Sequence, residues 1–314
     1  MEKSKICVMG SFAVDLTSHA PHLPVKGETV MGTRFQLGPG GKGSNQAVAA
    51  KRAGGDVCLV TKVGKDVFGQ VALDNFKKEG IYSPFIFEDD ALATGTALIM
   101  VDADGANSIL VVPGACANIT QAEVESCREL LAQSCILLTQ LEVNMDATER
   151  MVALAHELGV QVILNTAPVQ PVQDDLLAMV DIVTPNEIEA GILTGIEVKD
   201  QHSARMAAEY FFEKGVSQAV ITLGDKGVYC NDGTRELLLP ATPVQVVDTT
   251  GAGDTFSGAF AAALAEGKGF FEAAVFGNVA AGIAVSRFGA AVSTPHRGEI
   301  DAALAKHAGL FVGL

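Results

Sequence analysis

Short apolar runs alternate with helix-like runs along most of this 314-residue chain. The apolar runs, which predict strands, are residues 6–9, 57–63, 136–141, 160–164, 182–184 and 219–223. The runs that predict helices are residues 44–53, 69–78, 122–132, 146–158, 204–214 and 258–265. A strand that is apolar throughout is buried on both faces, and a helix between two such strands joins them in parallel. The alternation therefore restricts the fold to the α/β class, with a mostly parallel sheet covered by helices.

Glycines and capping residues mark the ends of the predicted helices. A glycine follows four of the helical runs and precedes a strand, and these are Gly54, Gly80, Gly159 and Gly215. Glycine is favoured there because it adopts the left-handed backbone conformation that ends many helices. Thr120 and Glu123 have the spacing of a capping box and predict the start of a helix. After residue 223 we expect a hairpin with Asp232 and Gly233 at its turn.

The composition indicates a well-packed globular protein, and we expect residues 1–314 to form one domain. Hydrophobic residues make up 48% of the chain and the mean hydropathy is +0.30, which provides for a sizeable core. The net charge of −15 argues against a nucleic-acid partner, because a phosphate backbone requires a basic surface. An acidic protein still binds ATP where backbone N–H groups and a metal ion meet the phosphates.

The cysteines and the first residues bear on the compartment of the protein. The six cysteines are scattered without a Cys-x-x-Cys pair, which matches neither a zinc site nor a compact disulfide framework. We expect Cys7, Cys58 and Cys135, which lie in apolar runs, to be buried reduced thiols. Residues 1–5 do not resemble a signal peptide, and no apolar run is long enough to span a bilayer. The sequence thus predicts a cytoplasmic protein without membrane contact.

Residues 11–37 and 94–112 interrupt the alternation. Both regions are rich in turns and have no helical periodicity. We expect them to pair as a small antiparallel sheet, set apart from the main one and able to act as a lid that excludes water from a reaction. An ordinary edge hairpin is the alternative interpretation.

Residues 247–256 combine glycines with an acid at the start of a predicted helix. They read Val-Asp-Thr-Thr-Gly-Ala-Gly-Asp-Thr-Phe. Free backbone N–H groups at a helix N-terminus favour an anion, and Asp254 would lie beside it. A base next to a bound phosphate suggests phosphoryl transfer to an alcohol. The alternative is a glycine-rich turn in which Asp254 only caps the helix.

Another glycine cluster, the first along the chain, lies at residues 38–47 and reads Gly-Pro-Gly-Gly-Lys-Gly-Ser-Asn-Gln-Ala. Glycines allow the backbone to approach a ligand closely, and Lys42 and Asn45 add a charge and an amide. The cluster is not a Walker A loop, because Gly43 separates Lys42 from Ser44. It also lacks the dinucleotide-binding glycine pattern in its strand-to-helix context. A purely structural turn remains the alternative.

In order and spacing, these segments resemble the ribokinase, or PfkB, family of carbohydrate kinases. Residues 40–45 resemble the first signature of that family and residues 248–254 the second. Residues 184–189, Thr-Pro-Asn-Glu-Ile-Glu, resemble its Asn-x-x-Glu element. The resemblance covers nearly the whole chain. It implies a ribokinase-like three-layer fold with a small β-sheet lid, and an ATP-dependent sugar kinase that also uses Mg²⁺ and K⁺.

The resemblance also implies roles for single residues. Asp254 matches the catalytic base, and the anion hole for the transferring phosphoryl group matches Gly251, Ala252 and Gly253. Asn186 and Glu189 match residues that organise Mg²⁺ and its waters, although Glu189 is also typical of the first turn of a helix. The positions around ATP match Asn186, Thr222, Gly224, Asp225, Lys226, Gly227, Gly253 and Asn278. On their own, residues 224–227 are typical of a plain turn and Asn278 of a helix surface.

The sugar and cation sites follow from the same resemblance. The acceptor pocket matches Ala13, Asp15, Gly41, Lys42, Gly43, Asn45, Glu142 and Asp254. Glu142 follows an apolar strand run, and ligands of open α/β sheets bind at the carboxyl ends of strands. Asp15 on its own is an acid in a turn. A potassium site would use Asp248, Thr250, Ala284, Arg287, Gly289 and Ser293, mostly through backbone carbonyls.

One position departs from the family pattern. Many ribokinases have Asn where this chain has Ala13, and the deoxyribokinases of the family have a non-polar residue there. A site built to hydrogen-bond a hydroxyl rejects analogues without it, so Ala13 relaxes that demand. We therefore expect D-ribose as the substrate and keep 2-deoxy-D-ribose as an alternative, with a nucleoside kinase or a sugar sensor without turnover as further possibilities. The exposed edges of the expected lid favour a homodimer.

Overall fold

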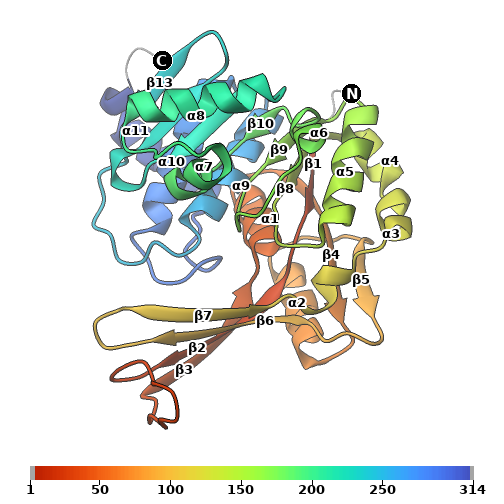
Figure 1. Ribbon diagram of the computed structural model, residues 1–314, viewed down its shortest axis with the longest axis vertical. Coiled ribbons are helices and arrows are strands. Elements are labelled where there is room, and N and C mark those ends of the chain that lie inside the picture. The colour runs from red at the N-terminus through yellow and green to blue at the C-terminus, as the bar shows by residue number, and fades with distance from the viewer. Residues whose placement is uncertain (1–3, 312–314) are drawn as a thin grey trace.

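A computed structural model describes residues 4–311 and contains two sheets (Figure 1). The larger sheet has the strand order β13-β12-β11-β10-β9-β8-β1-β4-β5. Its strands are β1 (Lys5–Met9), β4 (Asp56–Gly64), β5 (Ile86–Asp89), β8 (Ser134–Thr139), β9 (Gln161–Leu164), β10 (Ile182–Val183), β11 (Gln218–Thr222), β12 (Val228–Asn231) and β13 (Glu236–Leu239). Neighbouring strands are parallel from β11 to β5, and only β12 and β13 pair antiparallel. The predicted mostly parallel sheet is confirmed.

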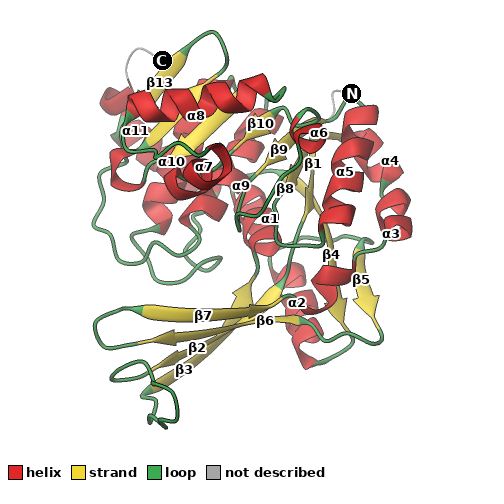
Figure 2. Ribbon diagram, in the orientation of Figure 1, coloured by secondary structure: helices red, strands yellow, loops and turns green. Residues whose placement is uncertain are grey.

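Helices cover both faces of this sheet (Figure 2). One face packs against α1 (Lys42–Arg52), α2 (Val67–Lys78), α9 (Ala252–Ala265), α10 (Phe270–Ala284) and α11 (Arg297–Lys306). The other packs against α3 (Gln121–Ser126), α4 (Arg128–Gln133), α5 (Met145–Glu157), α6 (Asp174–Leu177), α7 (Glu187–Thr194) and α8 (Gln201–Glu213). Alternate residues of β1 are buried on opposite faces of the sheet. Ile6 and Val8 pack in the core beneath the first group of helices, and Cys7 and Met9 pack in the core beneath the second. The apolar runs are therefore continuous because the strands are buried on both faces, as the sequence predicts.

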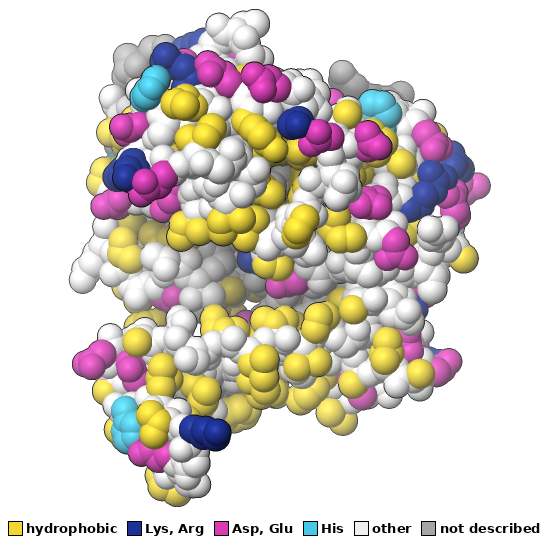
Figure 3. Space-filling model, in the orientation of Figure 1, with side chains coloured by type: hydrophobic (Ala, Val, Ile, Leu, Met, Phe, Trp, Pro, Cys, Tyr) yellow, Lys and Arg dark blue, Asp and Glu magenta, His cyan; other side chains and the backbone are white. Residues whose placement is uncertain are grey.

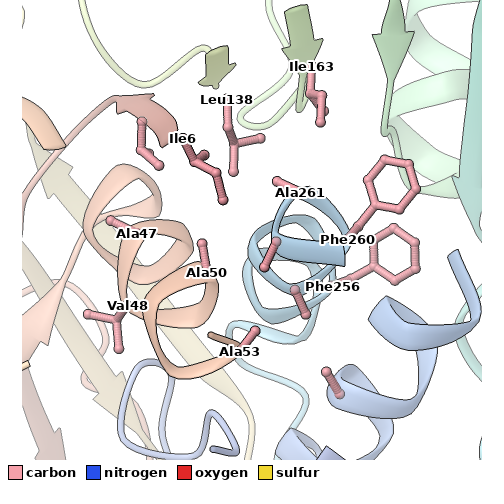
Figure 4. Packing of buried hydrophobic residues seen from close by; sticks show 14 of the residues in the cluster. Ile6, Ala47, Val48, Ala50, Ala53, Leu138, Ile163, Phe256, Phe260 and Ala261 are labelled. Carbon is pink, nitrogen blue, oxygen red and sulfur yellow. The ribbon is translucent and has the colours of Figure 1, made fainter. Parts of the chain in front are cut away.

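Two small-residue helices lie next to each other in the first layer. Figure 4 shows α1 beside α9, with Ala50 on the side of α1 that faces α9. A β-carbon placed on Gly258 would lie only 2.4 Å from the Gln46 carbonyl oxygen and 2.6 Å from the Ala49 β-carbon. The glycine thus permits an approach of the two helix backbones that a larger residue would prevent. This close packing fixes how the first turns of α1 and α9 face each other.

Some predicted helices differ from the observed ones. The helix expected over residues 122–132 is interrupted at Cys127, which separates α3 from α4. The hydroxyl of Ser126 donates to the Glu123 carbonyl oxygen at 2.6 Å, and the Cys127 thiol donates to it at 3.4 Å, so side chains compete there for a helical acceptor. The Thr120 capping box is confirmed. Helix α9 starts six residues before the predicted residue 258, so Asp254 lies within its first turn.

The smaller sheet has the strand order β3-β2-β6-β7, with β2 (Ala13–His19), β3 (Arg34–Gly40), β6 (Gly95–Val101) and β7 (Asn107–Val112). The regions expected to form a separate sheet do form it, but the sheet is not wholly antiparallel, because β2 and β6 are parallel. The reason is that both strands follow the carboxyl side of the main sheet and leave it in the same direction (Figure 1). Strand β3 ends at Gly40, inside the first glycine cluster at residues 38–47.

Among the helices of residues 4–311, none is long and apolar enough to cross a bilayer. Cys7 and Cys58 are buried thiols, as expected. Cys135 is only half-buried, which corrects the expectation that it lies in the core; its thiol donates to the Lys5 carbonyl oxygen at 3.4 Å. The Asp232–Gly233 turn joins β12 to β13, with a φ of 82° at Gly233.

Candidate active site

The second glycine loop forms the N-terminus of α9. Gly251 occupies the N-cap position with a φ of 73°, a left-handed conformation that glycine adopts without strain. A β-carbon there would also lie 2.9 Å from the Ala290 α-carbon. The first turn of the helix brings Asp254 inward, and its side chain is buried. The turn therefore holds a carboxylate beside the N–H groups of a helix N-terminus, as the sequence predicts.

The first glycine cluster places an amide on each oxygen of Asp254. Asn45 Nδ2 donates to Asp254 Oδ2 at 3.0 Å, and Gln46 Nε2 donates to Asp254 Oδ1 at 3.0 Å. Both donors lie near the start of α1, whose N-cap residue Gly41 has a φ of 84°. The two glycine regions are about 200 residues apart in sequence but meet at this carboxylate. Asp254 is therefore more than a cap of its own helix.

A cavity of about 150 Å³ opens at the start of α9. Its lining includes Gly251, Ala252, Gly253 and Asp254. The remaining lining residues are Lys42, Asn165, Ala167, Thr184, Asn186, Glu189, Thr222, Thr249, Phe256 and Ser257. The cavity lies beyond the carboxyl ends of β9, β10 and β11, where open α/β sheets bind ligands. Backbone amides, an ammonium group and two carboxylates thus share one small space.

Two further acids lie next to this cavity. The Glu142 Oε2 atom accepts a hydrogen bond from the Lys42 backbone N–H at 2.8 Å and another from the Ser11 hydroxyl. Burial, together with the negative charges of Glu142 and Asp254, raises the pKa of Asp15 to about 6. The expected sugar residues therefore form one acidic, partly dehydrated group. Carboxylates of this kind accept hydrogen bonds from hydroxyl groups of a ligand.

Lys42 is the cation of the site. Lys42 was expected in the sugar pocket, and it also lines the cavity with Gly251–Asp254. Burial lowers the pKa of Lys42, but the carboxylates of Asp254, Glu142 and Glu189 outweigh it and hold that pKa above its ordinary value. An ammonium group that stays charged beside a helix N-terminus attracts an anion.

Asn186 and Glu189 form a capping box at the start of α7 and also line the cavity. Asn186 Oδ1 accepts hydrogen bonds from the backbone N–H groups of Ile188 and Glu189, at 2.9 and 2.8 Å. Glu189 Oε2 in turn accepts from the Asn186 N–H at 3.1 Å and from the Thr166 hydroxyl at 3.0 Å. Placing Glu189 in the first turn of a helix was therefore right, and that position does not remove it from the cavity.

The expected ATP residues divide into those at the cavity and those beyond it. Thr222 lines the cavity, and Gly224, Asp225 and Lys226 form the short 3₁₀ turn that follows β11. The Lys226 ammonium donates to the Lys199 carbonyl oxygen at 2.7 Å. Gly227 lies against the chain after β13, where a β-carbon would be 1.9 Å from the Leu239 carbonyl oxygen.

Asn278 is not the helix-surface residue that its sequence context alone suggested. It is buried on α10, and its Nδ2 atom donates to the Pro240 carbonyl oxygen at 2.8 Å. Its amide therefore connects α10 to the loop that runs from β13 towards α9.

The residues expected to bind potassium lie in two segments, 248–250 and 284–293, that are joined by a hydrogen bond between Asp248 and Gly289. Asp248 Oδ2 accepts from the Gly289 N–H at 2.9 Å, and Asp248 Oδ1 accepts from the Thr250 N–H at 2.9 Å. Arg287 Nη1 donates to the Ser293 carbonyl oxygen at 3.4 Å, and the backbone N–H of Arg287 donates to the Ala284 carbonyl oxygen at 3.0 Å. The set presents carbonyl, hydroxyl and carboxylate oxygens, which are ligands suited to a hard cation.

Several cavity residues are absent from the predicted set. Asn165 and Thr184 follow β9 and β10, and Asn165 Nδ2 donates to the Thr184 carbonyl oxygen at 3.0 Å. Their signal was a polar residue directly after an apolar strand run. Two buried residues that do not line the cavity were missed as well. Gln46 lies inside the first glycine motif, and Gln140, which directly follows β8, donates to Gln46 at 2.7 Å.

Comparison with known proteins places this site in a family. Residues 3–297 match the pfkB family carbohydrate kinase profile. The chain is 41% identical over 297 residues to ribokinase of Haemophilus influenzae, covering 95% of this chain and 97% of that one. It is 35% identical over 257 residues to deoxyribokinase of Salmonella typhi, covering 82% and 84% of the two chains.

The same likeness extends to the fold. The structure of Arabidopsis thaliana ribokinase complexed with ribose and ATP superimposes with a TM-score of 0.89 at 30% identity. The alignment covers 97% of this chain and 99% of that one. The match thus includes both sheets and the two glycine loops, and the chain belongs to the pfkB family of carbohydrate kinases.

Proposed function

We propose that this chain is an ATP-dependent kinase that phosphorylates the 5-hydroxyl of D-ribose to give D-ribose 5-phosphate. The observation that carries the proposal is Asp254 in the same cavity as the amide groups of Gly251–Gly253. The relative named ribokinase and the likeness to a ribokinase complexed with ribose and ATP support the choice of substrates.

In this proposal Asp254 removes the proton of the sugar hydroxyl. The hydroxyl oxygen then forms a bond to the γ-phosphorus of ATP, and the bond from that phosphorus to the bridging oxygen breaks. The electron pair of the broken bond leaves with ADP. The N–H groups of Gly251–Gly253 and the ammonium of Lys42 stabilise the charge of the moving phosphoryl group. The carboxylates of Asp15 and Glu142 accept hydrogen bonds from the sugar hydroxyls, and the Asn45 amide also hydrogen-bonds to the sugar. The backbone of Gly41 and Gly43 lies against the sugar.

The remaining residues of the expected site bind the nucleotide and the cations in this proposal. Thr222, residues 224–227 and Asn278 bind the phosphates and nucleoside of ATP in this proposal. Asn186 and Glu189 would hold Mg²⁺, partly through water, and when bound the ion neutralises phosphate charge. Within residues 4–311 no group of three or more His, Cys, Asp or Glu side chains is suited to hold a metal ion, which fits an ion that phosphate oxygens help to bind. K⁺ would bind at the turn around Asp248 and Gly289.

Deoxyribose is a second candidate substrate because of one residue. Ala13 is buried at the start of β2 and pairs with Gly40, beside the expected sugar pocket. Its methyl group offers a sugar hydroxyl neither a donor nor an acceptor. The relative named deoxyribokinase is less similar to the chain than the ribokinase is, so ribose is the first choice.

A coupled assay of ADP release with a panel of sugars and nucleosides tests the proposal. We expect the highest kcat/KM with D-ribose, measurable turnover with 2-deoxy-D-ribose, and a stronger ribose preference in Ala13→Asn, because the amide adds a partner for a sugar hydroxyl. ADP release that no sugar stimulates would disprove a sugar kinase. A higher kcat/KM for 2-deoxy-D-ribose than for D-ribose would make deoxyribose the preferred substrate.

The raised pKa of Asp15 gives a pH-dependent prediction. Because this pKa is about 6 in the fold and 3.8 without its surroundings, ionised Asp15 destabilises the folded state above about pH 6. This penalty shrinks as the pH falls below about 6, because the folded protein then binds the proton, and it is gone below about pH 3.8, where the unfolded chain binds the proton as well. We expect Asp15→Asn to raise the melting temperature clearly at about pH 8 and much less at about pH 4, while sugar binding weakens. An equal gain at both pH values would contradict this assignment.

We also propose a homodimer formed through the small sheet. Strand β7 is an edge strand whose residues are all exposed, and Leu110 is 61% exposed. Figure 3 shows hydrophobic side chains gathered across the small sheet. Exposed apolar edges of this kind favour pairing with another chain. Light scattering at micromolar concentration should give about twice the mass of 32.6 kDa for the wild type and a lower mass for Leu110→Asp. A monomeric wild type would refute the dimer.

A further inference from the structure

We propose that Gln46 is a positioning residue for the catalytic base, held in place by Gln140. The inference rests on the proposed function, because it assigns to Gln46 the orientation of the Asp254 carboxylate. It concerns a side chain that the expected sugar, nucleotide and metal sites do not include. The three side chains form a row of hydrogen bonds that runs from the carboxyl end of β8, through α1, to α9.

Each amide in this row donates towards Asp254. Gln140 Nε2 donates to Gln46 Oε1 at 2.7 Å, and Gln46 Nε2 donates to Asp254 Oδ1 at 3.0 Å. Because the Gln46 oxygen is occupied by Gln140, its NH₂ group is directed at the carboxylate. Gln46 and Gln140 are both fully buried. A hydrogen bond to an ionised carboxylate in such surroundings is stronger than one between neutral groups.

The two oxygens of Asp254 then have different partners. Asn45 holds Oδ2, and in the proposed function Asn45 also contacts the sugar, so its bond to Asp254 changes when sugar binds. Gln46 does not line the cavity, which leaves its bond to Oδ1 intact during the reaction. With Oδ1 fixed, the carboxylate cannot rotate, and Oδ2 stays directed at the incoming hydroxyl. A base must keep its reacting oxygen within hydrogen-bond reach of the proton that it removes.

The structure accommodates Gln140 at a cost. Its Oε1 atom is buried and has no hydrogen-bond partner among residues 4–311. A β-carbon on Gly10 would lie 2.0 Å from this same oxygen, so only glycine leaves space for the side chain. An unpaired buried acceptor destabilises the fold, and its retention calls for another reason. Fixing the orientation of Gln46, and through it that of the base, is such a reason.

A double-mutant cycle separates positioning from a merely structural role. Gln46→Met keeps the size of the side chain but removes the donor. We expect it to lower kcat about 10- to 100-fold, with the KM values for sugar and ATP changed less than about threefold, because a misdirected base slows only the chemical step. In an Asp254→Asn background, the same substitution should lower kcat less than about twofold, since the group that Gln46 positions is gone. The sugar is the one on which the wild type is most active.

Gln140→Met in the same two backgrounds provides an independent second cycle, and it decides the question if Gln46→Met does not fold. We expect a drop of about 3- to 10-fold in the wild-type background and none with Asp254→Asn. Thr148→Val, which also removes a fully buried polar group but lies on α5, should leave kcat unchanged in both backgrounds.

The outcomes are distinct. An equal loss of kcat in both backgrounds, or an unchanged kcat for Gln46→Met beside Asp254, would overturn the positioning role. A wild-type protein that phosphorylates no sugar would instead overturn the proposed function. Melting temperatures of all variants show whether a loss of kcat follows unfolding.

Discussion

Asp254→Asn should lower kcat by about 10²- to 10⁴-fold with D-ribose and ATP, because the amide cannot accept the hydroxyl proton. The size of the side chain is kept, and the anion-binding N–H groups of Gly251–Gly253 remain. We therefore expect the KM for ATP to change little. The measurement is steady-state ADP release, with single-turnover kinetics to show that the chemical step is the one that slows.

The substitution also has a structural cost that must be measured separately. Asn45 and Gln46 both donate to the Asp254 carboxylate, and the Asn variant offers only one acceptor oxygen. One buried donor thus loses its partner, which should lower the free energy of unfolding by about 1–3 kcal/mol. Asp200→Asn is the matched control, because Asp200 caps the exposed start of α8 and Asn is an equally good cap. Near wild-type kcat in Asp254→Asn would remove this residue from the mechanism.

Apolar periodicity was sufficient to predict the main sheet. The ends of each predicted strand lie within one or two residues of those of an observed strand. The prediction works because a strand that is buried on both faces is a short, continuous apolar run. Asn278 was expected on a helix, but no range was predicted for α10, since its residues from Ala273 to Ala280 are buried together and leave no polar face to set a period. Strand β5 was missed because its four residues, Ile-Phe-Glu-Asp, are half polar.

The candidate site was predictable to the extent that its residues lie in motifs. Asp254, Lys42 and Asn45 stand in glycine-rich segments that lead directly into helices, a pattern typical of anion-binding loops. Asp254 and Lys42 do line one cavity, and Asn45 donates to Asp254. Gln140 carries no such signal, because a glutamine at the end of a buried strand is chemically ordinary. Only the packing of α1 against α9 brings it, through Gln46, into line with the base. Contacts of this kind depend on distances between helices, which a sequence does not state.

Gly258→Ala tests whether that packing controls the site. The added methyl group would lie 2.4 Å from the Gln46 carbonyl oxygen and 2.8 Å from the Ala50 backbone nitrogen, so two helix backbones must move apart. Overpacking of this kind should lower the free energy of unfolding by about 1–3 kcal/mol, measured by urea denaturation.

The same substitution should also slow catalysis, although Gly258 does not line the cavity. Asp254 lies one helical turn before Gly258, and its partners Asn45 and Gln46 belong to the opposing helix, so separation of α1 from α9 stretches both hydrogen bonds. A displacement near 1 Å can cost about 100-fold in rate, and we expect kcat to fall by about 10- to 100-fold. Gly298→Ala is the control, because a β-carbon there meets nothing within 4 Å on helix α11 and alanine favours a helix. If Gly258→Ala were as stable and active as Gly298→Ala, the contact between the two helices would not set the geometry of the base.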